Sequence, residues 1–306
     1  MKKFNGPSFW LRYLIDRDRR SVPLALRPLY KKIFFHSLRV LGTPPNIFRG
    51  KDFNNKIRWS MLFDQSADTV VCSDKLAVRD WVAARIGQAY LNKIYSIWDD
   101  PSAIDFGDLP PDFVLKTNHD SGSVWIIRDK SSVDLPALRA KVAGRMNRVY
   151  GAEKGEWAYS HIHPKAFAEE MLSAPEEGIS DYKFHCAGGR VAFVQYISER
   201  RTAQPSEQIV MPDGKVSEYL LDSNFRKGSG FERPIEWNEM ITIAEKLAQP
   251  FAYVRVDLYL VYGQIRFGEM TFAPRAGCYR GADQAALGAL LALDRANPRP
   301  PLHAAW

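Results

Sequence analysis

The sequence predicts an α+β fold, because antiparallel hairpins are interspersed with segments of helical periodicity. Two hairpins give the clearest signals: residues 181–198 turn on Gly188 and Gly189, and residues 254–272 alternate apolar and polar residues around a Tyr–Gly pair. Helical spacing of apolar residues covers residues 73–87, 135–150, 234–247 and 282–293. With 306 residues, 46% hydrophobic and 25% charged, the chain is long and apolar enough for one or two globular cores.

The first element is a basic, helical N-terminal extension over residues 1–48. Residues 1–50 hold eleven Lys or Arg against only Asp16 and Asp18, so the net charge of +7 is concentrated there. Aromatic and aliphatic residues are mixed with these bases, a composition suited to a helix lying on an anionic surface. Acidic lipid, an acidic glycan or the body of the protein itself would each fit, whereas no recognised motif supports nucleic acid.

The next elements follow a Pro/Gly-rich break at residues 41–50. Ser73 is expected to cap a helix that Gly87 ends, and an apolar strand should follow it at residues 90–100. We divide the rest of the chain as follows: a helical or α+β region at 49–110, a main domain at 111–293 with subdomains at about 111–165 and 166–293, and a tail at 294–306.

Residues 109–129 predict a turn, a strand, a loop of small polar residues and a second strand. Lys116 ends the first strand, and the following loop could fold over phosphates through its backbone N–H groups while the ammonium neutralises charge. A solvated lysine at a strand end is the simpler alternative. Neither a GxxxxGK[ST] nor a GxGxxG sequence occurs, which excludes a P-loop and a Rossmann phosphate site.

The last hairpin carries two carboxylates, Asp257 and Glu269, whose relative position depends on the length of the loop. A three-residue loop, 262–264, would place them directly opposite each other on one face, whereas a two-residue loop would pair Asp257 with Gly268 and turn Glu269 away. Facing carboxylates repel, so a cation should lie between them. Mg²⁺ is our interpretation, since it takes oxygen ligands and is held by one or two carboxylates plus substrate phosphates. The alternative is a solvated hairpin whose acids pair with Arg255 and Arg266.

Other charged residues are less specific. Asp181, Lys183 and His185 share one strand face, and of the adjacent Glu169 and Glu170 one should face a cleft and the other solvent.

Three widely spaced cysteines give neither a disulfide framework nor a zinc site. Without an apolar span or a cleavable signal peptide, we expect a cytoplasmic protein that is peripheral at most to the inner face of the membrane.

Taken in order, five motifs resemble the ATP-grasp superfamily, and within it the teichuronopeptide-biosynthesis (TupA-like) type. They are SDKLAVRDWV, FVLKTNHDSGS, FAEEML, DYKFHCAGGR and VRVDLY…GQIRFGEMTFAPRAG, spread over about residues 54–281. The resemblance implies an ATP-grasp fold, in which two α+β subdomains hold ATP between antiparallel sheets. ATP and one or two Mg²⁺ are the implied cofactors.

The resemblance also implies roles for individual residues. Arg79, or less well Lys75, resembles the phosphate-binding residue of the first subdomain, and Lys116 resembles the strand lysine at the phosphates. Ser121, Gly122 and Ser123 belong to the covering loop. Glu169 or Glu170 would meet adenine, Asp181 the ribose, and Lys183 the phosphates. The catalytic residues implied are Arg255, Lys116 and Lys183; the metal ligands implied are Asp257, Glu269 and Thr271, the last where many ATP-grasp enzymes have Asn. Arg275 and Arg280 are candidates for gripping a substrate carboxylate.

The implied activity is an ATP-dependent carboxylate–amine ligase that forms an amide through an acyl phosphate. Its partners would be a uronic-acid-containing surface glycan or lipid-linked precursor and an amino acid or other small amine. The protein would also make peripheral contact with an anionic membrane. Two alternatives stay open: a kinase of a sugar hydroxyl, and a non-catalytic glycan- or nucleotide-binding protein. The identity of the sugar and of the amino acid, the number of metal ions and the oligomeric state are not predicted.

Overall fold

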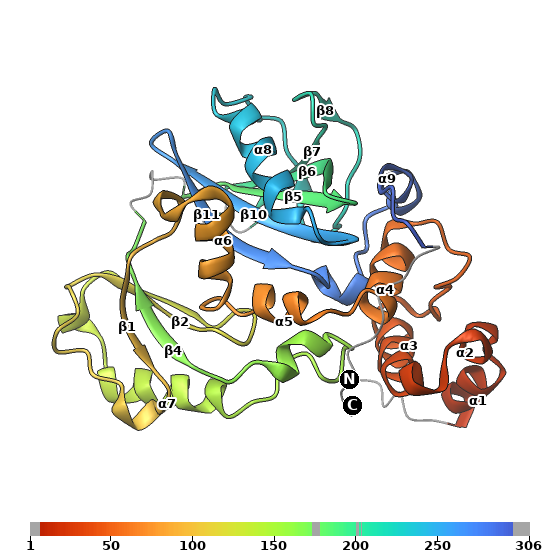
Figure 1. Ribbon diagram of the computed structural model, residues 1–306, viewed down its shortest axis with the longest axis horizontal. Coiled ribbons are helices and arrows are strands. Elements are labelled where there is room, and N and C mark those ends of the chain that lie inside the picture. The colour runs from red at the N-terminus through yellow and green to blue at the C-terminus, as the bar shows by residue number, and fades with distance from the viewer. Residues whose placement is uncertain (1–6, 173–177, 200–201, 203, 296–306) are drawn as a thin grey trace.

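The computed structural model describes residues 7–172, 178–199, 202 and 204–295, and within them the strands form two sheets. Most of the tail predicted at 294–306 therefore lies outside the described residues. In Figure 1 the seven-stranded sheet occupies the upper part and the four-stranded sheet the lower left. This mixture of helices with antiparallel sheets confirms the α+β prediction.

The four-stranded sheet has the order β1-β4-β2-β3 and is antiparallel throughout. Its strands are β1 (Ile94–Trp98), β2 (Phe113–Thr117), β3 (Val124–Ile127) and β4 (Ala166–Glu169). Helix α7 (Leu135–Met146), which Asp134 caps by accepting the N–H of Ala137 at 2.9 Å, packs on one face of this sheet. The period of two turns Lys116 and Glu169 to the other face, away from α7.

The seven-stranded sheet has the order β11-β10-β5-β6-β7-β8, with β9 parallel to β7. Its strands are β5 (Asp181–Ala187), β6 (Arg190–Ser198), β7 (Ser206–Val210), β8 (Val216–Ser217), β9 (Arg226–Lys227), β10 (Tyr253–Val261) and β11 (Gln264–Thr271). Helix α8 (Trp237–Ala248) and part of α6 (Val78–Ile86) bury the face that carries Val254, Val256 and Leu258. The polar residues at alternate positions of β10, Arg255 and Asp257, therefore lie on the opposite face.

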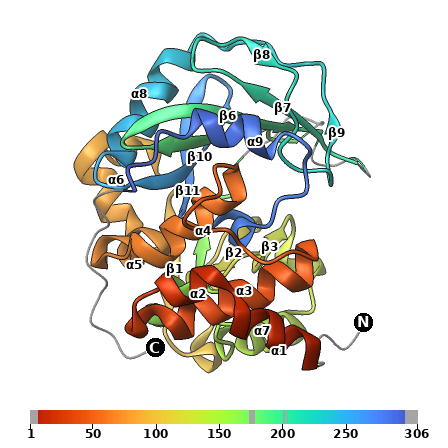
Figure 2. The same cartoon turned by 90° about the vertical axis from the view of Figure 1, so that its right-hand side faces the viewer.

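The N-terminal extension is helical, as predicted, and packs on the body of the protein. It contains α1 (Pro7–Ile15), α2 (Arg17–Ser21) and α3 (Arg27–Leu41), which lie together at one edge of the molecule in Figure 2. Tyr30, Ile33 and Phe34 of α3 are buried in one core with residues of α4 (Phe53–Phe63) and of the large sheet. Tyr13, Tyr30 and Phe34 of the extension therefore serve packing.

Two boundaries differ from the prediction. Ser73 does not begin a helix; it ends α5 (Ala67–Ser73), which Ser66 caps, and α6 starts only at Val78. Strand β4, which we placed in the second subdomain beginning at residue 166, pairs with β1 and β2 of the first sheet. The chain passes from one sheet to the other after Glu169. Local sequence gives no signal for this, because sheet membership is decided by long-range pairing. The remaining helix, α9 (Gln284–Leu290), packs against α4.

Candidate functional site

Asp257 and Glu269 lie opposite each other on adjacent strands, as predicted, but the predicted loop is wrong. Val261 pairs with Gln264, so the loop consists of two residues, Tyr262 and Gly263, both with positive φ. A β-bulge between Asp257 and Leu258 inserts one extra residue, Gly268, into β11 and restores the alternation. The short loop and the bulge together produce the pairing that we expected from a longer loop.

The cation between the two carboxylates is Arg255. This is one of the two arginines that we named as partners in the alternative to a metal site. Its guanidinium donates to Asp257 Oδ1 at 2.6 Å, to Asp257 Oδ2 at 2.7 Å and to Glu269 Oε1 at 3.0 Å. It also donates to Thr271 Oγ1 at 3.1 Å. A single buried arginine therefore connects three side chains that project from β10 and β11.

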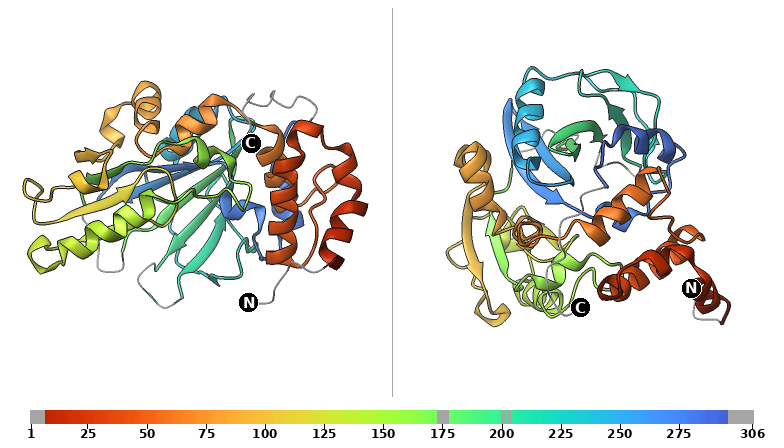
Figure 3. Two further views of the ribbon diagram at one scale, coloured as in Figure 1. Left: turned by 90° about the horizontal axis from the view of Figure 1, so that it is seen from below. Right: turned by 45° about the vertical axis from the view of Figure 1, so that its right-hand side comes forward.

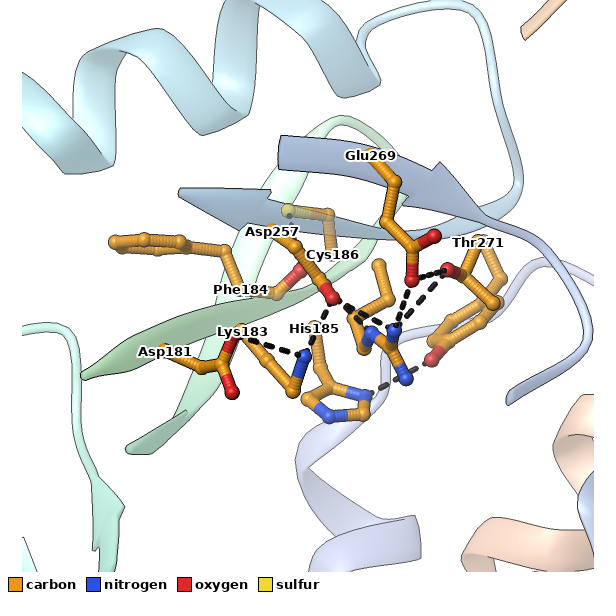
Figure 4. A network of polar contacts seen from close by, with 10 residues as sticks. Asp181, Lys183, Phe184, His185, Cys186, Asp257, Glu269 and Thr271 are labelled. Atoms are coloured by element: carbon orange, nitrogen blue, oxygen red, sulfur yellow. Dashed lines mark hydrogen bonds and ion pairs between the residues drawn. The ribbon is translucent and has the colours of Figure 1, made fainter. Parts of the chain in front are cut away.

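Lys183 of β5 completes this group from the neighbouring strand. Its Nζ lies 2.6 Å from Asp257 Oδ2 and 3.7 Å from Asp181 Oδ1. Figure 4 shows Asp181, Lys183 and Asp257 on one side of the sheet and Phe184 on the other. His185 shares their face but is fully buried, and its Nδ1 contacts the hydroxyl of Tyr253 at 2.9 Å, so it belongs to the core.

The electrostatics of this group keep it charged. Burial opposes ionisation of Asp257, yet Arg255 and Lys183 together hold the pKa of its carboxyl below the ordinary value. Burial likewise opposes the charge on Arg255, but Asp257 and Glu269 raise its pKa above that of a free arginine. Asp257 is 1% exposed, whereas the side chain of Glu269 is 35% exposed. Glu269 is therefore the carboxylate that a ligand can reach.

A second charged group faces the first across the gap between the sheets. Lys116 forms an ion pair with Glu169, the member of the glutamate pair that points into the cleft. Glu170 turns aside, and its carboxylate accepts from the backbone N–H of Lys93 at 3.4 Å. Arg79 also lines this cleft and donates to the carbonyl of Asn92 at 2.7 Å.

Lys75 links the cleft to the loop after β2. Its ammonium donates to the carbonyl of Asp120, and burial lowers its pKa. Ser121 and Gly122 are exposed, with Gly122 at φ +85°, a conformation that favours glycine. Ser123 is buried and its hydroxyl donates to the Asp120 carboxylate, so this hydroxyl serves the loop's own structure.

The Arg255 group also lines a cavity of about 660 Å³. Arg275 and Arg280 lie on its wall, where Arg275 is 2.7 Å from the carboxylate of Asp222 and Arg280 donates to the carbonyl of Val40 at 2.9 Å. Arg275 has φ +53° and the following Ala276 φ +49°, a left-handed backbone that is costly for residues other than glycine.

The chain matches the family model described as TupA-like ATP-grasp over residues 55–290. It belongs to the TupA-like ATP-grasp family. No curated protein matches the sequence. The matched range covers both sheets and every predicted site residue, and it begins after the basic extension.

Solved structures of ATP-grasp proteins are similar at low identity. A D-alanine–D-alanine ligase from Bacillus anthracis, complexed with ATP, is 16% identical with a TM-score of 0.43, over 72% of this chain and 65% of the other. The ATP-grasp ligase PsnB, complexed with a minimal precursor, is 16% identical with a TM-score of 0.38, over 74% of this chain and 63% of that one. A RimK domain ATP-grasp protein from Sphaerobacter thermophilus is 12% identical with a TM-score of 0.39, over 72% and 67%. The chain thus spans less than two thirds of the length of the first two ligases.

The cavity wall carries oxygen atoms of the kind that Mg²⁺ takes as ligands. Thr271 Oγ1 lies 3.2 Å from Glu269 Oε1, and both residues line the large cavity. Asp257 is 1% exposed and its carboxylate is held by Arg255 and Lys183, so it could ligate a metal only if these cations moved aside. Among the described residues no three His, Cys, Asp or Glu side chains form a metal cluster. Glu269 and Thr271 are thus the donors within reach of an ion that takes its other ligands from water and phosphate.

Several residues that line the large cavity were not predicted from the sequence. Tyr150, Glu156 and Tyr159 line the wall opposite the hairpin, and His36 reaches it from the extension. No sequence pattern singled out these residues, so only the three-dimensional structure places them at the cavity. The positive φ values at Arg275 and Ala276 likewise have no counterpart in the sequence, where "PRAG" reads as an ordinary turn.

Proposed function

We propose that this ATP-grasp protein is an ATP-dependent carboxylate–amine ligase. The observation that carries the proposal is the group formed by Arg255, Lys183, Asp257 and Glu269 at the wall of a cavity large enough for a small substrate. A carboxylate is a poor electrophile, and phosphorylation converts it into an acyl phosphate that an amine can attack. Family membership supports this reaction type over other uses of the same charged groups.

In this proposal the cations act on developing charge. Lys116 of the small sheet and Lys75 of the turn between α5 and α6 would contact the phosphates, while Lys183 and Arg255 of the large sheet would contact the transferred phosphoryl group. Mg²⁺, held by Glu269, Asp257 and Thr271, would neutralise phosphate oxygens. The acids that pair with these cations, Glu169 and Asp257, keep them charged and oriented before substrate arrives.

Nucleotide binding would also require the sheets to move apart. The cleft between Lys116 on one side and Gly268 on the other holds only about 30 Å³. Ligand sites in proteins span about 300–1,000 Å³, so the cleft as it stands is closed. Opening and closing of this kind would shield an acyl phosphate from water.

We propose a uronic acid of a surface polysaccharide, or of its lipid-linked precursor, as the carboxylate, and an amino acid as the amine. Arg275 and Arg280 at the cavity wall support an anionic acceptor, although each already contacts a protein oxygen. Lys154 also lines the cavity and adds positive charge to its wall.

The test uses purified full-length protein with Mg²⁺, ATP and a uronic-acid oligosaccharide. With hydroxylamine as the amine we expect ADP release and a hydroxamate, detected by mass spectrometry, because hydroxylamine traps acyl phosphates. Amino acids should then replace hydroxylamine and give an amide. A phosphorylated sugar formed without any amine would instead establish a kinase, and nucleotide binding without turnover would establish a non-catalytic protein.

A further inference from the structure

Helix α1 presents an apolar face that the described part of the chain leaves largely exposed, with only Trp10 packing partly on Phe35. Trp10, Leu11, Leu14 and Ile15 have exposed fractions of 43–62%. Their spacing places them on one side of the helix, while Tyr13 on the other side is buried against Tyr30 and Phe34. Single exposed apolar residues are ordinary, but four in a nine-residue helix form a patch that needs an explanation.

The charges around this patch are positive. Arg12, Arg17 and Arg20 are exposed. The two acids of the segment are half-buried and accept hydrogen bonds from the protein: Asp16 accepts from Tyr30 Oη and from the N–H of Arg19, and Asp18 accepts from the N–H groups of Ile47 and Phe48. The outer surface of α1 and α2 therefore combines apolar residues with arginine.

A hollow of about 480 Å³ lies beside the patch, between these helices and the loop at residues 44–49. Ile15 and Phe48 give it an apolar lining, and its charged lining consists of three arginines, Arg12, Arg17 and Arg49, and two aspartates, Asp16 and Asp18. Arginine binds phosphate well, because its planar guanidinium offers several donors. The three arginines outnumber the two aspartates, whose carboxylates already accept hydrogen bonds from the protein, so the rim of the hollow can receive a phosphate group that is attached to an apolar chain.

We propose that the outer face of α1, together with this hollow, docks on an anionic lipid bilayer. Trp and Leu on one side with Arg around them are the residues by which interfacial helices bind membranes, and anionic lipid supplies the complementary charge. Within the described residues no helix could cross a bilayer, so the contact would be peripheral. Figure 3 shows α1 at the outer edge of the molecule, away from both sheets, where a flat surface can approach it.

The proposal does not depend on the ligase chemistry, because α1 lies outside the family match at residues 55–290. It does connect to the large cavity, since α3 of the same extension contributes His36 and Val40 to the cavity wall. Docking through α1 would hold that cavity at the bilayer surface.

Flotation of the full-length protein with vesicles tests the proposal. We expect it to float with vesicles of equal parts phosphatidylcholine and phosphatidylglycerol, to float poorly with phosphatidylcholine alone, and to dissociate at high salt. Leu11→Glu with Leu14→Glu should lower the bound fraction about tenfold or more, since it removes apolar contact and adds repulsion. Ile235→Glu is the matched control, because Ile235 is 99% exposed and lies near α8.

A second variant, Arg17→Glu with Arg20→Glu, should weaken binding while leaving the apolar face intact. Thermal melting checks that each variant is folded. Equal flotation of wild type and both double variants would overturn the proposal. Wild-type protein that fails to float with anionic vesicles would also overturn it. In that case, sedimentation velocity would show whether the face binds a second copy of the chain: the wild type would then be a dimer and the Leu11→Glu, Leu14→Glu variant a monomer.

Discussion

At the scale of single residues, the two facing carboxylates have different surroundings and should behave differently on substitution. Asp257 is buried between Arg255 and Lys183, whereas the Glu269 carboxylate reaches the cavity. Removal of one partner from a buried ion pair leaves an uncompensated charge. The stability of the fold therefore depends on Asp257 much more than on Glu269.

We expect Glu269→Gln to lower ADP release at least about 100-fold while changing the unfolding free energy by less than about 1 kcal/mol. Asp257→Asn should instead destabilise the fold by about 3–5 kcal/mol, because Arg255 and Lys183 lose their shared counter-ion. Urea denaturation and an ADP assay on both variants separate the two effects. Full ADP release by the Glu269 variant would contradict the assignment of Glu269 to the reaction.

Glu156 makes stability depend on pH. Burial raises its pKa to about 7 from the ordinary value of 4.5, and Lys154, 3.9 Å away, only partly offsets this. Between these two pH values the folded protein holds more protons than the unfolded chain, so the stability contributed by Glu156 is full below pH 4.5 and is lost as pH rises through 7.

Glu156→Gln should therefore gain stability relative to wild type as pH rises, by at most about 3 kcal/mol above pH 8. Urea midpoints at pH 5 and pH 9 measure this difference, and Glu153→Gln, an exposed glutamate of the same segment, should show none. A constant difference between wild type and the Glu156 variant at both pH values would show that burial does not hold the proton on this carboxyl.

At the scale of elements, the β10–β11 hairpin shows what the sequence could and could not predict. Alternation and the Tyr–Gly pair predicted the two strands, but Asp257 and Glu269 were expected on one face only with a three-residue loop, and the structure brings them together through a two-residue loop and a bulge. The bulge at Gly268 could not be foreseen, because a glycine within a strand is compatible with either regular pairing or a bulge. Similarly, Ser73 followed by Asp74 resembles a helix start, yet packing of α5 extends that helix through Ser73.

Gly268→Ala should destabilise the protein by about 1–3 kcal/mol and displace Glu269. A Cβ at this position would lie 2.8 Å from Tyr259 Cε2 and 3.0 Å from the Asp257 carbonyl oxygen. Gly144→Ala is the control: it lies exposed within α7, its Cβ would meet nothing within 4 Å, and we expect about 0.5–1 kcal/mol of stabilisation. Thermal melts of the two variants should therefore shift in opposite directions, and a neutral Gly268 variant would mean that the bulge can relax.

At the scale of the whole molecule, two sheets each bury one face under helices and turn charged residues toward each other. The extension is part of this architecture, because Phe53 of α4 contacts Phe193 and Tyr253 of the large sheet and shares its core with Tyr30 and Phe34 of α3. From the sequence, packing of the extension on the body of the protein was only one of three alternatives. An amphipathic helix has the same pattern whether its partner is lipid, glycan or protein.

Deletion of residues 1–48 should consequently prevent folding, although the family match begins only at residue 55. The deletion uncovers the aromatic surface of α4 and removes several fully buried side chains, and a single large-to-small change in a core already costs about 3–5 kcal/mol. We expect aggregated protein, or protein without a cooperative melting transition. Leu24→Asp serves as the control, because this extension residue is exposed and its substitution should leave melting unchanged. A truncated protein that melts cooperatively near the wild-type temperature would show instead that the extension is a dispensable appendage.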